Sequence, residues 1–578
     1  MLKKLNKLLD RKQKLKMCGI VILMLIGAVL ETFSIALIIP VLQLIMDPVA
    51  LESNETIMKV YHFLHMQDMK HFTVLMMLSL ILIFILKNLF LLFQNIIQYR
   101  FVYTNQFRTS ERMMINYMKR PYEYFLSADT AVVQRSITSD VNNMFAMILS
   151  ILQLLSEIII SFCIIAVTIT LEPVMTAVLA VLLITTVLVV KKVLKPIMEK
   201  TGKDNQDYYS GLFKWIQQAV TGVKEIKIGN REKYFIEEYK KCGQGYVNAV
   251  QKYSVYSSTP RLLIETICIA GMLGYLIVLI LSGNNVQDIL PLLGAFGVAA
   301  LRLMPSANRI NNHLTSISYF KPFTMGVSDN LQNEIADEKV RMDSLKRPSE
   351  KLQVKDKIEL KNITYAYPNT DVLIFDHAEM TIPIGDSVGI VGTSGAGKST
   401  VVDILLGLLT LKEGQILADG KDVLAPENYR KWLENIGYIP QSIFMLDDTI
   451  RKNVAFGVPD EEVSEERIWE VLKEAQLDTF VKGLPEGLDT GIGERGIRLS
   501  GGQRQRIGIA RALYDDPEVL VLDEATSALD HDTESAIMDS INSLHGKKTL
   551  IIIAHRLNTI ENCEMVYRVE NGKAFRER

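Results

Sequence analysis

One stretch decides how the carboxyl-terminal part of this chain folds: Gly392-Thr393-Ser394-Gly395-Ala396-Gly397-Lys398-Ser399. It follows the Val/Ile-rich run 388–391 and opens the apolar stretch 400–409, which is the strand, loop and helix context that a phosphate-binding P-loop requires. The glycines allow backbone N–H groups to turn toward phosphate oxygens at a helix N-terminus. A chance Gly/Ser turn would lack the flanking strand and helix, so the stretch predicts a nucleotide-binding α/β domain.

The residue types of this loop assign separate tasks to its members. Lys398 can reach the β and γ phosphates of a nucleotide, and the Ser399 hydroxyl can hold Mg²⁺. We therefore expect a nucleoside triphosphate and Mg²⁺ as cofactors. The predicted nucleotide-binding residues of the loop and helix start are Gly392, Thr393, Ser394, Gly395, Ala396, Gly397, Lys398, Ser399 and Thr400.

A second apolar run, 519–522, ends in two acidic residues, Asp523 and Glu524. Carboxylates at a strand end beside a P-loop are typical of phosphoryl transfer, where one acts on Mg²⁺ and another orients the attacking water. We assign the first task to Asp523 and the second to Glu524. A merely solvated strand end would be the better interpretation only if Lys398 and Ser399 were absent.

The first half of the chain predicts a membrane domain. Of the 578 residues, 49% are hydrophobic and 22% charged, and the apolar residues are concentrated before residue 320. A membrane-spanning helix needs roughly 20 mainly apolar residues. Six runs approach or exceed that length: 17–45, 72–97, 144–170, 174–192, 261–282 and 287–305. The predicted fold is thus a membrane α-helical domain of six transmembrane helices plus an α/β P-loop nucleotide-binding domain.

Charge and composition give the domain boundaries and the orientation. Lys and Arg cluster before the first span and in the connections 98–143 and 193–260, which places these parts in the cytoplasm. The connections are rich in helix-forming residues, so we expect the spans to continue into the cytoplasm as long helices. A polar stretch follows the last span. We predict a transmembrane domain at 1–325, a linker at 326–357 and the nucleotide-binding domain at 358–578.

The second domain resembles the ATP-binding cassette (ABC) transporter family. The stretch Leu499-Ser500-Gly501-Gly502-Gln503 matches the signature sequence of that family, about twenty residues before Asp523. The resemblance implies that the nucleotide is ATP and that Ser500, Gly501, Gly502 and Gln503 contact it. It also implies roles for three further residues: Tyr367 would stack on adenine, Gln441 would lie near Mg²⁺ and the attacking water, and His555 would touch the γ-phosphate.

In that family the signature of one cassette closes on the P-loop of another. The resemblance therefore implies a homodimer, in which Ser500 and Gly502 complete the partner's site around Lys398; a heterodimer stays open. The segment 490–496 and the fused six-helix unit resemble the exporter branch. The bends at 122–126 and 222–228 are predicted to dock on the cassettes.

The substrate is the least determined feature. Ionisable residues within spans are costly and usually face a cavity or a partner. Lys87, Arg261 and Arg302 are predicted to form a basic cavity for an anionic head group, with ion pairing or snorkelling as the alternative. The stretches 31–34 and 302–310 resemble the bacterial lipid-linked oligosaccharide flippases. That resemblance implies transport of a polyprenyl-pyrophosphate glycan across the plasma membrane.

Other functions remain possible from the sequence. The chain could export another lipid, a peptide or a drug-like amphiphile, or could be an ATP-gated channel or regulatory subunit. The net charge is −2, with 63 Lys and Arg against 65 Asp and Glu, so no basic excess favours a nucleic-acid partner. The six predicted spans also disfavour a soluble cassette ATPase that acts on DNA or ribosomes.

Overall fold

The computed structural model forms two compact units. Unit 1 comprises Met1–Arg120 and Ala128–Ala336, and unit 2 comprises Pro121–Ser127 and Asp337–Arg578. The structure describes residues 2–37, 61, 69–171, 173–281, 286–332, 346–348, 350–368, 370–524, 535, 537–538, 541–554 and 560–578; for some helical residues, among them Arg302, only the backbone is described.

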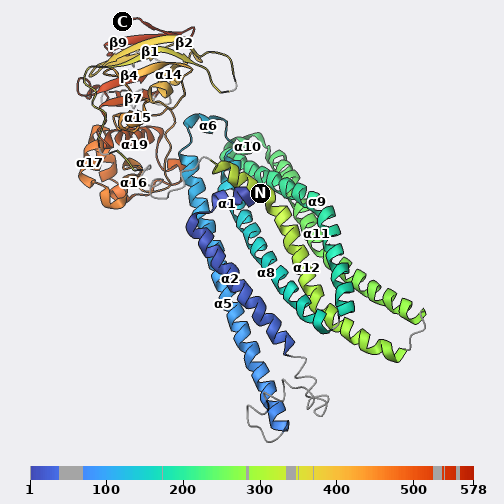
Figure 1. Ribbon diagram of the computed structural model, residues 1–578. Coiled ribbons are helices and arrows are strands. Elements are labelled where there is room, and N and C mark those ends of the chain that lie inside the picture. The colour runs from blue at the N-terminus through green and yellow to red at the C-terminus, as the bar shows by residue number, and fades with distance from the viewer. Residues whose placement is uncertain are drawn as a thin grey trace. The chain divides into compact units, whose positions relative to one another are not determined.

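Unit 1 is helical throughout its described parts (Figure 1). Six long helices correspond to the six predicted spans: α2 (Arg11–Ala36), α5 (Met69–Met118), α8 (Val141–Leu171), α9 (Pro173–Thr221), α11 (Glu232–Leu281) and α12 (Val286–Asn330). The short helices of the unit are α1 (Leu2–Leu8), α7 (Thr130–Arg135) and α10 (Val223–Gly229), and a single π-helical turn, η2 (Ser136–Asp140), leads into α8. Helix α8 ends and α9 begins on either side of residue 172, the predicted break.

The long helices exceed the thickness of a bilayer. Helix α5 has 50 residues, which at 1.5 Å per residue is about 75 Å, against about 30 Å for the hydrocarbon core. Its exposed apolar side chains include Val74, Leu82 and Ile96. Among the described residues, three segments are long and apolar enough to cross a membrane: Arg11–Ser34, His71–Met118 and Thr130–Ala166. Helix α5 thus extends well beyond one bilayer thickness, and the cytoplasmic location of the extensions stays a prediction.

The helices of unit 1 pack lengthwise. Helix α12 contacts α8, α9 and α11, and α2 contacts both α5 and α8 (Figure 1). One apolar cluster joins Ala28, Ile160, Ile264 and Leu303 from four helices. Helix α12 ends at Asn330, inside the stretch predicted as linker. The linker boundaries stay a prediction, because residues 333–345 lie outside the described part.

The described residues of unit 2 form two sheets. The antiparallel sheet has the order β2-β1-β4-β5, and the second sheet the order β10-β9-β3-β8-β7-β6. The strands are β1 (Lys357–Tyr365), β2 (Phe375–Pro383), β3 (Ser387–Val391), β4 (Glu413–Ala418), β5 (Lys421–Asp422), β6 (Ile436–Ile439), β7 (Val519–Asp523), β8 (Thr549–Ile553), β9 (Met565–Glu570) and β10 (Lys573–Arg576). The α-helices among its described residues are α6 (Tyr122–Ser127), α14 (Lys398–Leu405), α15 (Pro426–Leu433), α16 (Ile450–Val454), α17 (Glu465–Glu474), α18 (Asp478–Lys482) and α19 (Gly501–Tyr514).

The second sheet positions the site. Strands β9, β3, β8, β7 and β6 pair in parallel, and every residue of β3, β7 and β8 is buried. Burial on both faces explains why these strands are continuous Val/Ile/Leu runs rather than alternating ones. The carboxyl ends of parallel strands lie at one edge of a sheet, where α/β proteins bind their ligands. Strands β3 and β7 therefore deliver the P-loop and the two acidic residues to the same edge. The predicted α/β fold is confirmed.

Candidate functional site: a P-loop nucleotide site

The P-loop connects β3 to α14, as predicted. Residues 392–397 form the loop, and Lys398, Ser399 and Thr400 lie in the first turn of the helix. The Lys398 side chain is 5% exposed and folds back over the loop, where its Nζ donates hydrogen bonds of 3.1 Å to the carbonyls of Gly392 and Thr393. A lysine held here lies among backbone N–H groups at a helix start, which is the arrangement that binds phosphate.

Two glycines of the loop are required by their surroundings. A Cβ on Gly392 would lie 2.5 Å from the Val569 carbonyl oxygen, which leaves no room for a side chain. Gly397 has φ +102°, a conformation that side chains disfavour, and a Cβ there would lie 2.9 Å from Ile374. The loop is thus held close to neighbouring elements and keeps its backbone exposed to a ligand.

Ser399, Gln441 and Asp523 are the residues predicted to hold Mg²⁺, and the first and last of them meet at the sheet edge. The Ser399 hydroxyl donates a hydrogen bond of 3.3 Å to the carboxylate of Asp523, which is 8% exposed. Burial and the negative charge of Asp523 raise the pKa of the nearby Asp403 to about 6. Two carboxylates that disfavour each other's charge form an environment that attracts a cation. A serine hydroxyl and a carboxylate are ligands that Mg²⁺ accepts beside nucleotide phosphates, so the residues fit the ion.

Glu524 and Gln441 lie in direct contact. The Gln441 side-chain Nε2 donates a hydrogen bond of 2.7 Å to Oε2 of Glu524. Glu524 has φ 49°, in the left-handed region, and its backbone N–H donates to the Ile553 carbonyl of β8. A non-glycine residue in this region carries strain of about 1 kcal/mol or more, which is typical of functional positions. The sequence suggested both residues, and the structure brings them together.

Tyr367 lies beside the helix that follows the P-loop. Its hydroxyl is 3.0 Å from the Thr400 hydroxyl, and its ring meets Tyr365 edge to face at 5.3 Å. Tyr367 is partly exposed. His555, the remaining predicted catalytic residue, lies outside the described residues.

The signature residues form the start of a helix. Ser500 caps α19: its hydroxyl accepts from the Gln503 N–H, and the Gln503 side chain accepts from the Ser500 N–H. This capping box fixes the helix start. Ser500 and Gly501 are exposed and Gly502 is buried. An exposed helix N-terminus with a serine is suited to contact an anionic group brought by another molecule.

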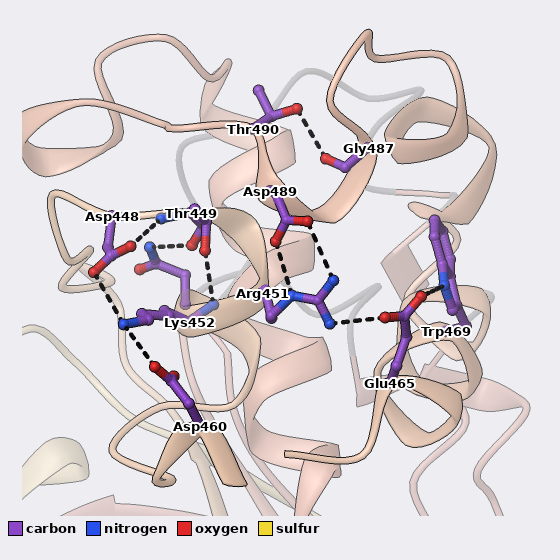
Figure 2. Close-up of polar contacts among 11 residues, drawn as sticks. Asp448, Thr449, Arg451, Lys452, Asp460, Glu465, Trp469, Gly487, Asp489 and Thr490 are labelled. Atoms are coloured by element: carbon purple, nitrogen blue, oxygen red, sulfur yellow. Dashed lines mark hydrogen bonds and ion pairs between the residues drawn. The ribbon is translucent and has the colours of Figure 1, made fainter.

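The segment 490–496 is tied to the residues that follow Gln441. Thr449 forms a β-bridge with Gly491, and Arg451 pairs with Asp489 at 2.8 Å and with Glu465 at 2.9 Å (Figure 2). Arg451 thus joins α16 to the turn before this segment and to α17. The segment leads directly into the signature, so these contacts form a continuous link from Gln441 to Ser500.

Helix α6 belongs to the nucleotide-binding unit although it lies between α5 and α7 in the chain. The Glu123 carboxylate accepts hydrogen bonds from the Thr410 backbone N–H at 3.0 Å and the Tyr365 hydroxyl at 3.4 Å. Tyr365 also contacts Tyr367, so a single residue, Tyr365, connects Glu123 of α6 to the ring predicted to stack on adenine. Sequence layout predicted the docking of this bend but not the role of Glu123. Helix α10, the second predicted docking bend, is grouped with unit 1.

The predicted substrate residues are not gathered around one cavity by any described contact. Lys87 lies on α5 with its Nζ 4.5 Å from the centroid of the Phe84 ring. Arg261 lies exposed on α11. Arg302 lies in α12, and its side chain is outside the described part. The grouping of these three residues stays a prediction.

Comparison with known proteins matches both units. The family model for the ABC transporter transmembrane region matches residues 16–299, and the ABC transporter model matches residues 375–527. An ATP-dependent lipid A-core flippase of Pseudoalteromonas translucida is 41% identical over 244 residues, which is 42% of this chain and 41% of that protein. The chain thus spans less than half the length of this relative. An uncharacterized ABC transporter ATP-binding protein of Bacillus subtilis, YfiC, is 29% identical over 86% of this chain and 81% of its own length.

A solved structure of a bacterial Atm1-family ABC exporter with ATP bound has a TM-score of 0.76 and covers 98% of this chain and 95% of its own, at 21% identity. That likeness shows the fold. Six long helices followed by a P-loop domain define a membrane protein with a fused nucleotide-binding domain. With the two family models added, the chain belongs to the ABC transporter family.

Proposed function

We propose that this protein hydrolyses ATP to move a lipid-linked oligosaccharide between the leaflets of the plasma membrane. The observation that carries the ATPase part is the contact between Gln441 and Glu524 directly after Asp523, which lies against Ser399. A channel or regulatory subunit that only binds nucleotide would not need a positioned pair of this kind.

The proposed chemistry follows from the positions of the side chains. Lys398 and the loop N–H groups hold the phosphates, Ser399 and Asp523 hold Mg²⁺, and Tyr367 stacks on adenine. Mg²⁺ supplies charge neutralisation at the phosphates when bound. Glu524 accepts the proton of a water whose oxygen attacks the γ-phosphorus, while the bond to the β-γ bridging oxygen breaks and ADP leaves. Gln441 orients Glu524 through its 2.7 Å hydrogen bond, and His555 is assigned to the γ-phosphate.

The proposed assembly is a dimer. The described residues carry one P-loop unit, and the exposed N-terminus of α19 at Ser500 has the form expected of a surface that closes on a second nucleotide site. Two copies would give two complete sites and twelve spans. A heterodimer would require a partner with its own P-loop and signature. The nucleotide-binding units would lie in the cytoplasm, as the Lys and Arg bias of the connections indicates.

The proposed substrate is an anionic lipid with a polar head group. The resemblance of residues 31–34 and 302–310 to lipid-linked oligosaccharide flippases supports a polyprenyl-pyrophosphate glycan. The names of relatives such as the lipid A-core flippase support a second candidate, a glycolipid of the lipid A type. Both candidates are anionic glycolipids too polar to cross a bilayer unaided.

Stimulated ATP hydrolysis separates these candidates. The purified protein in liposomes is assayed with a polyprenyl-pyrophosphate oligosaccharide, with a lipid A-core glycolipid and with a phosphatidylglycerol control. We expect the polyprenyl-linked glycan to raise the rate of ATP hydrolysis severalfold, and to do so at a lower concentration than either of the other two lipids. If only the lipid A-core glycolipid stimulates ATP hydrolysis, the proposed substrate becomes a glycolipid of the lipid A type. Equal hydrolysis rates with all three lipids would reject a glycolipid substrate.

A further inference from the structure

A polar cavity lies within the apolar helices of unit 1. Its volume is about 300 Å³, and its walls come from α2, α5, α8 and α12. Three of these helices each contribute a pair of polar residues at i and i+4, which places both members on one face. The pairs are Gln94 and Gln98, Gln153 and Glu157, and Arg309 and His313.

Several polar atoms of this cavity have no hydrogen-bond partner among the described residues. They are Oε1 of Gln94, Nε2 of Gln98 and Oε2 of Glu157. Gln94 is 6% exposed and Gln98 is 3% exposed, so bulk solvent does not satisfy them. A buried amide without a partner costs free energy, and more so among membrane-spanning helices. Side chains that are costly for folding and gathered around a cavity point to a ligand that supplies the missing partners.

The charges of the cavity are already paired. Nε of Arg309 lies 2.6 Å from Oε1 of Glu157, and a second guanidinium nitrogen donates to the Ser306 hydroxyl at 3.3 Å. A pyrophosphate would be held best by unpaired cations. What the cavity offers instead is five neutral amides, each with donors and an acceptor, from Gln94, Asn95, Gln98, Gln153 and Asn312. Such groups suit hydroxyl and acetamido groups.

We propose that this cavity binds a sugar ring of the transported lipid, while the phosphate is held elsewhere. This inference rests on the proposed function and names the part of the substrate that the cavity recognises. Gly27 of α2 leaves room for the side-chain amide of Gln94, because a Cβ on Gly27 would lie 2.4 Å from Oε1 of Gln94. A larger residue at position 27 would push the Gln94 amide out of its place.

The test is equilibrium binding of three lipids to the full-length protein, with Gln98→Leu as the variant. The lipids are a polyprenyl-pyrophosphate oligosaccharide, the same polyprenyl pyrophosphate without sugar, and a diglucosyl diacylglycerol. Asn88→Leu is the matched control, since it removes an exposed amide from the same helix outside the cavity. Thermal unfolding of the lipid-free proteins is measured in parallel.

The inference expects Gln98→Leu to weaken binding of both sugar-bearing lipids about tenfold and to leave the sugar-free lipid unchanged. Asn88→Leu should change none of the three. Because Nε2 of Gln98 has no hydrogen-bond partner among the described residues, the variant should unfold at the same temperature as the wild type or higher.

Unchanged binding of the sugar-bearing lipids, or equal weakening of all three lipids, would overturn the inference. A marked loss of thermal stability in Gln98→Leu would also overturn it, because the amide would then serve packing. The proposed function fails separately: if the polyprenyl-linked glycan binds through Gln98 but ATP does not move it between leaflets, the cavity stands and the flippase does not.

Discussion

The amide of Gln441 donates a 2.7 Å hydrogen bond to the carboxylate of Glu524, from a loop 83 residues earlier in the chain. The bond fixes the carboxylate at the edge of the sheet where β3 delivers the P-loop. Glu524 directly follows strand β7, so the position of the carboxylate depends on both the sheet and the loop that carries Gln441. In the proposed mechanism this pair positions the water that attacks the γ-phosphate.

Replacing Glu524 by Gln should stop turnover while ATP still binds. The neutral amide keeps the shape of the side chain but does not accept a proton from water, so we expect a loss of roughly 10²- to 10⁴-fold in hydrolysis. Phosphate release and retention of labelled ATP are measured together. Glu570→Gln, at an exposed position of β9, is the control. Turnover near the wild-type rate in Glu524→Gln would remove this residue from the mechanism.

Replacing Gln441 by Leu should have a smaller effect of about tenfold on kcat, with KM for ATP nearly unchanged. The reason is that Gln441 orients Glu524 and does not itself accept the proton. Steady-state hydrolysis over a range of ATP concentrations separates the two parameters. A raised KM with an unchanged kcat would instead assign Gln441 to nucleotide binding.

Replacing Gly392 by Ala should distort the P-loop. The new Cβ would lie 2.5 Å from the Val569 carbonyl, and overpacking of this kind costs about 1 to 3 kcal/mol of folding free energy. We expect weaker ATP binding and a lower unfolding temperature. Gly491→Ala is the control, because nothing lies within 4 Å of a Cβ at that position. If both substitutions changed ATP binding and the unfolding temperature equally, the close approach of the Val569 carbonyl to Gly392 would not explain the effect.

Removing one member of the ion pair between Glu157 and Arg309 should lower the free energy of unfolding more than replacing both members. Arg309→Leu leaves the carboxylate of Glu157, whose side chain is 13% exposed, without its cation. We expect a loss of about 1 to 2 kcal/mol, moderated by the 46% exposure of the Arg309 side chain. The double variant Glu157→Gln with Arg309→Gln should recover most of the unfolding temperature. Additive losses in the double variant would show that the two residues act independently.

Stability should depend on pH through Asp403. Its pKa is raised to about 6 by burial and by Asp523, above the usual value of about 3.9 for a free aspartate. The folded protein therefore holds this proton more tightly than the unfolded chain, so this carboxyl costs stability in full above pH 6 and less as the pH falls toward 4. In the absence of nucleotide and Mg²⁺, Asp403→Asn should raise the unfolding temperature at pH 7.5 more than at pH 4.5. A shift independent of pH would contradict this assignment.

The nucleotide site could be predicted from the sequence because phosphate chemistry dictates its spacing. A loop that wraps phosphate needs glycines at fixed positions, and Lys398 and Ser399 must follow at the helix start. Strand β3, which precedes the loop, and strand β7, which precedes Glu524, are apolar runs typical of buried strands. The family resemblance selected Gln441 as a site residue, but its contact with Glu524 was not predicted, since nothing local to either residue indicates the other.

The polar cavity of unit 1 could not be predicted in the same way. Sequence reasoning selected Lys87, Arg261 and Arg302 by charge, whereas five of the ten residues that line the described cavity are neutral amides. Its residues come from four helices whose packing is not encoded in any short motif. The one readable signal was the i and i+4 spacing of polar residues within apolar helices, as at Gln94 and Gln98.

The most direct test of the account is movement of a fluorescent polyprenyl-pyrophosphate oligosaccharide in liposomes that contain the purified protein. A membrane-impermeant quencher reports the fraction of the lipid in the outer leaflet. The account predicts that ATP changes this fraction with the wild-type protein and does not with Glu524→Gln. Vigorous ATP hydrolysis with an unchanged distribution of the lipid would contradict the claim that this protein is a lipid-linked oligosaccharide flippase.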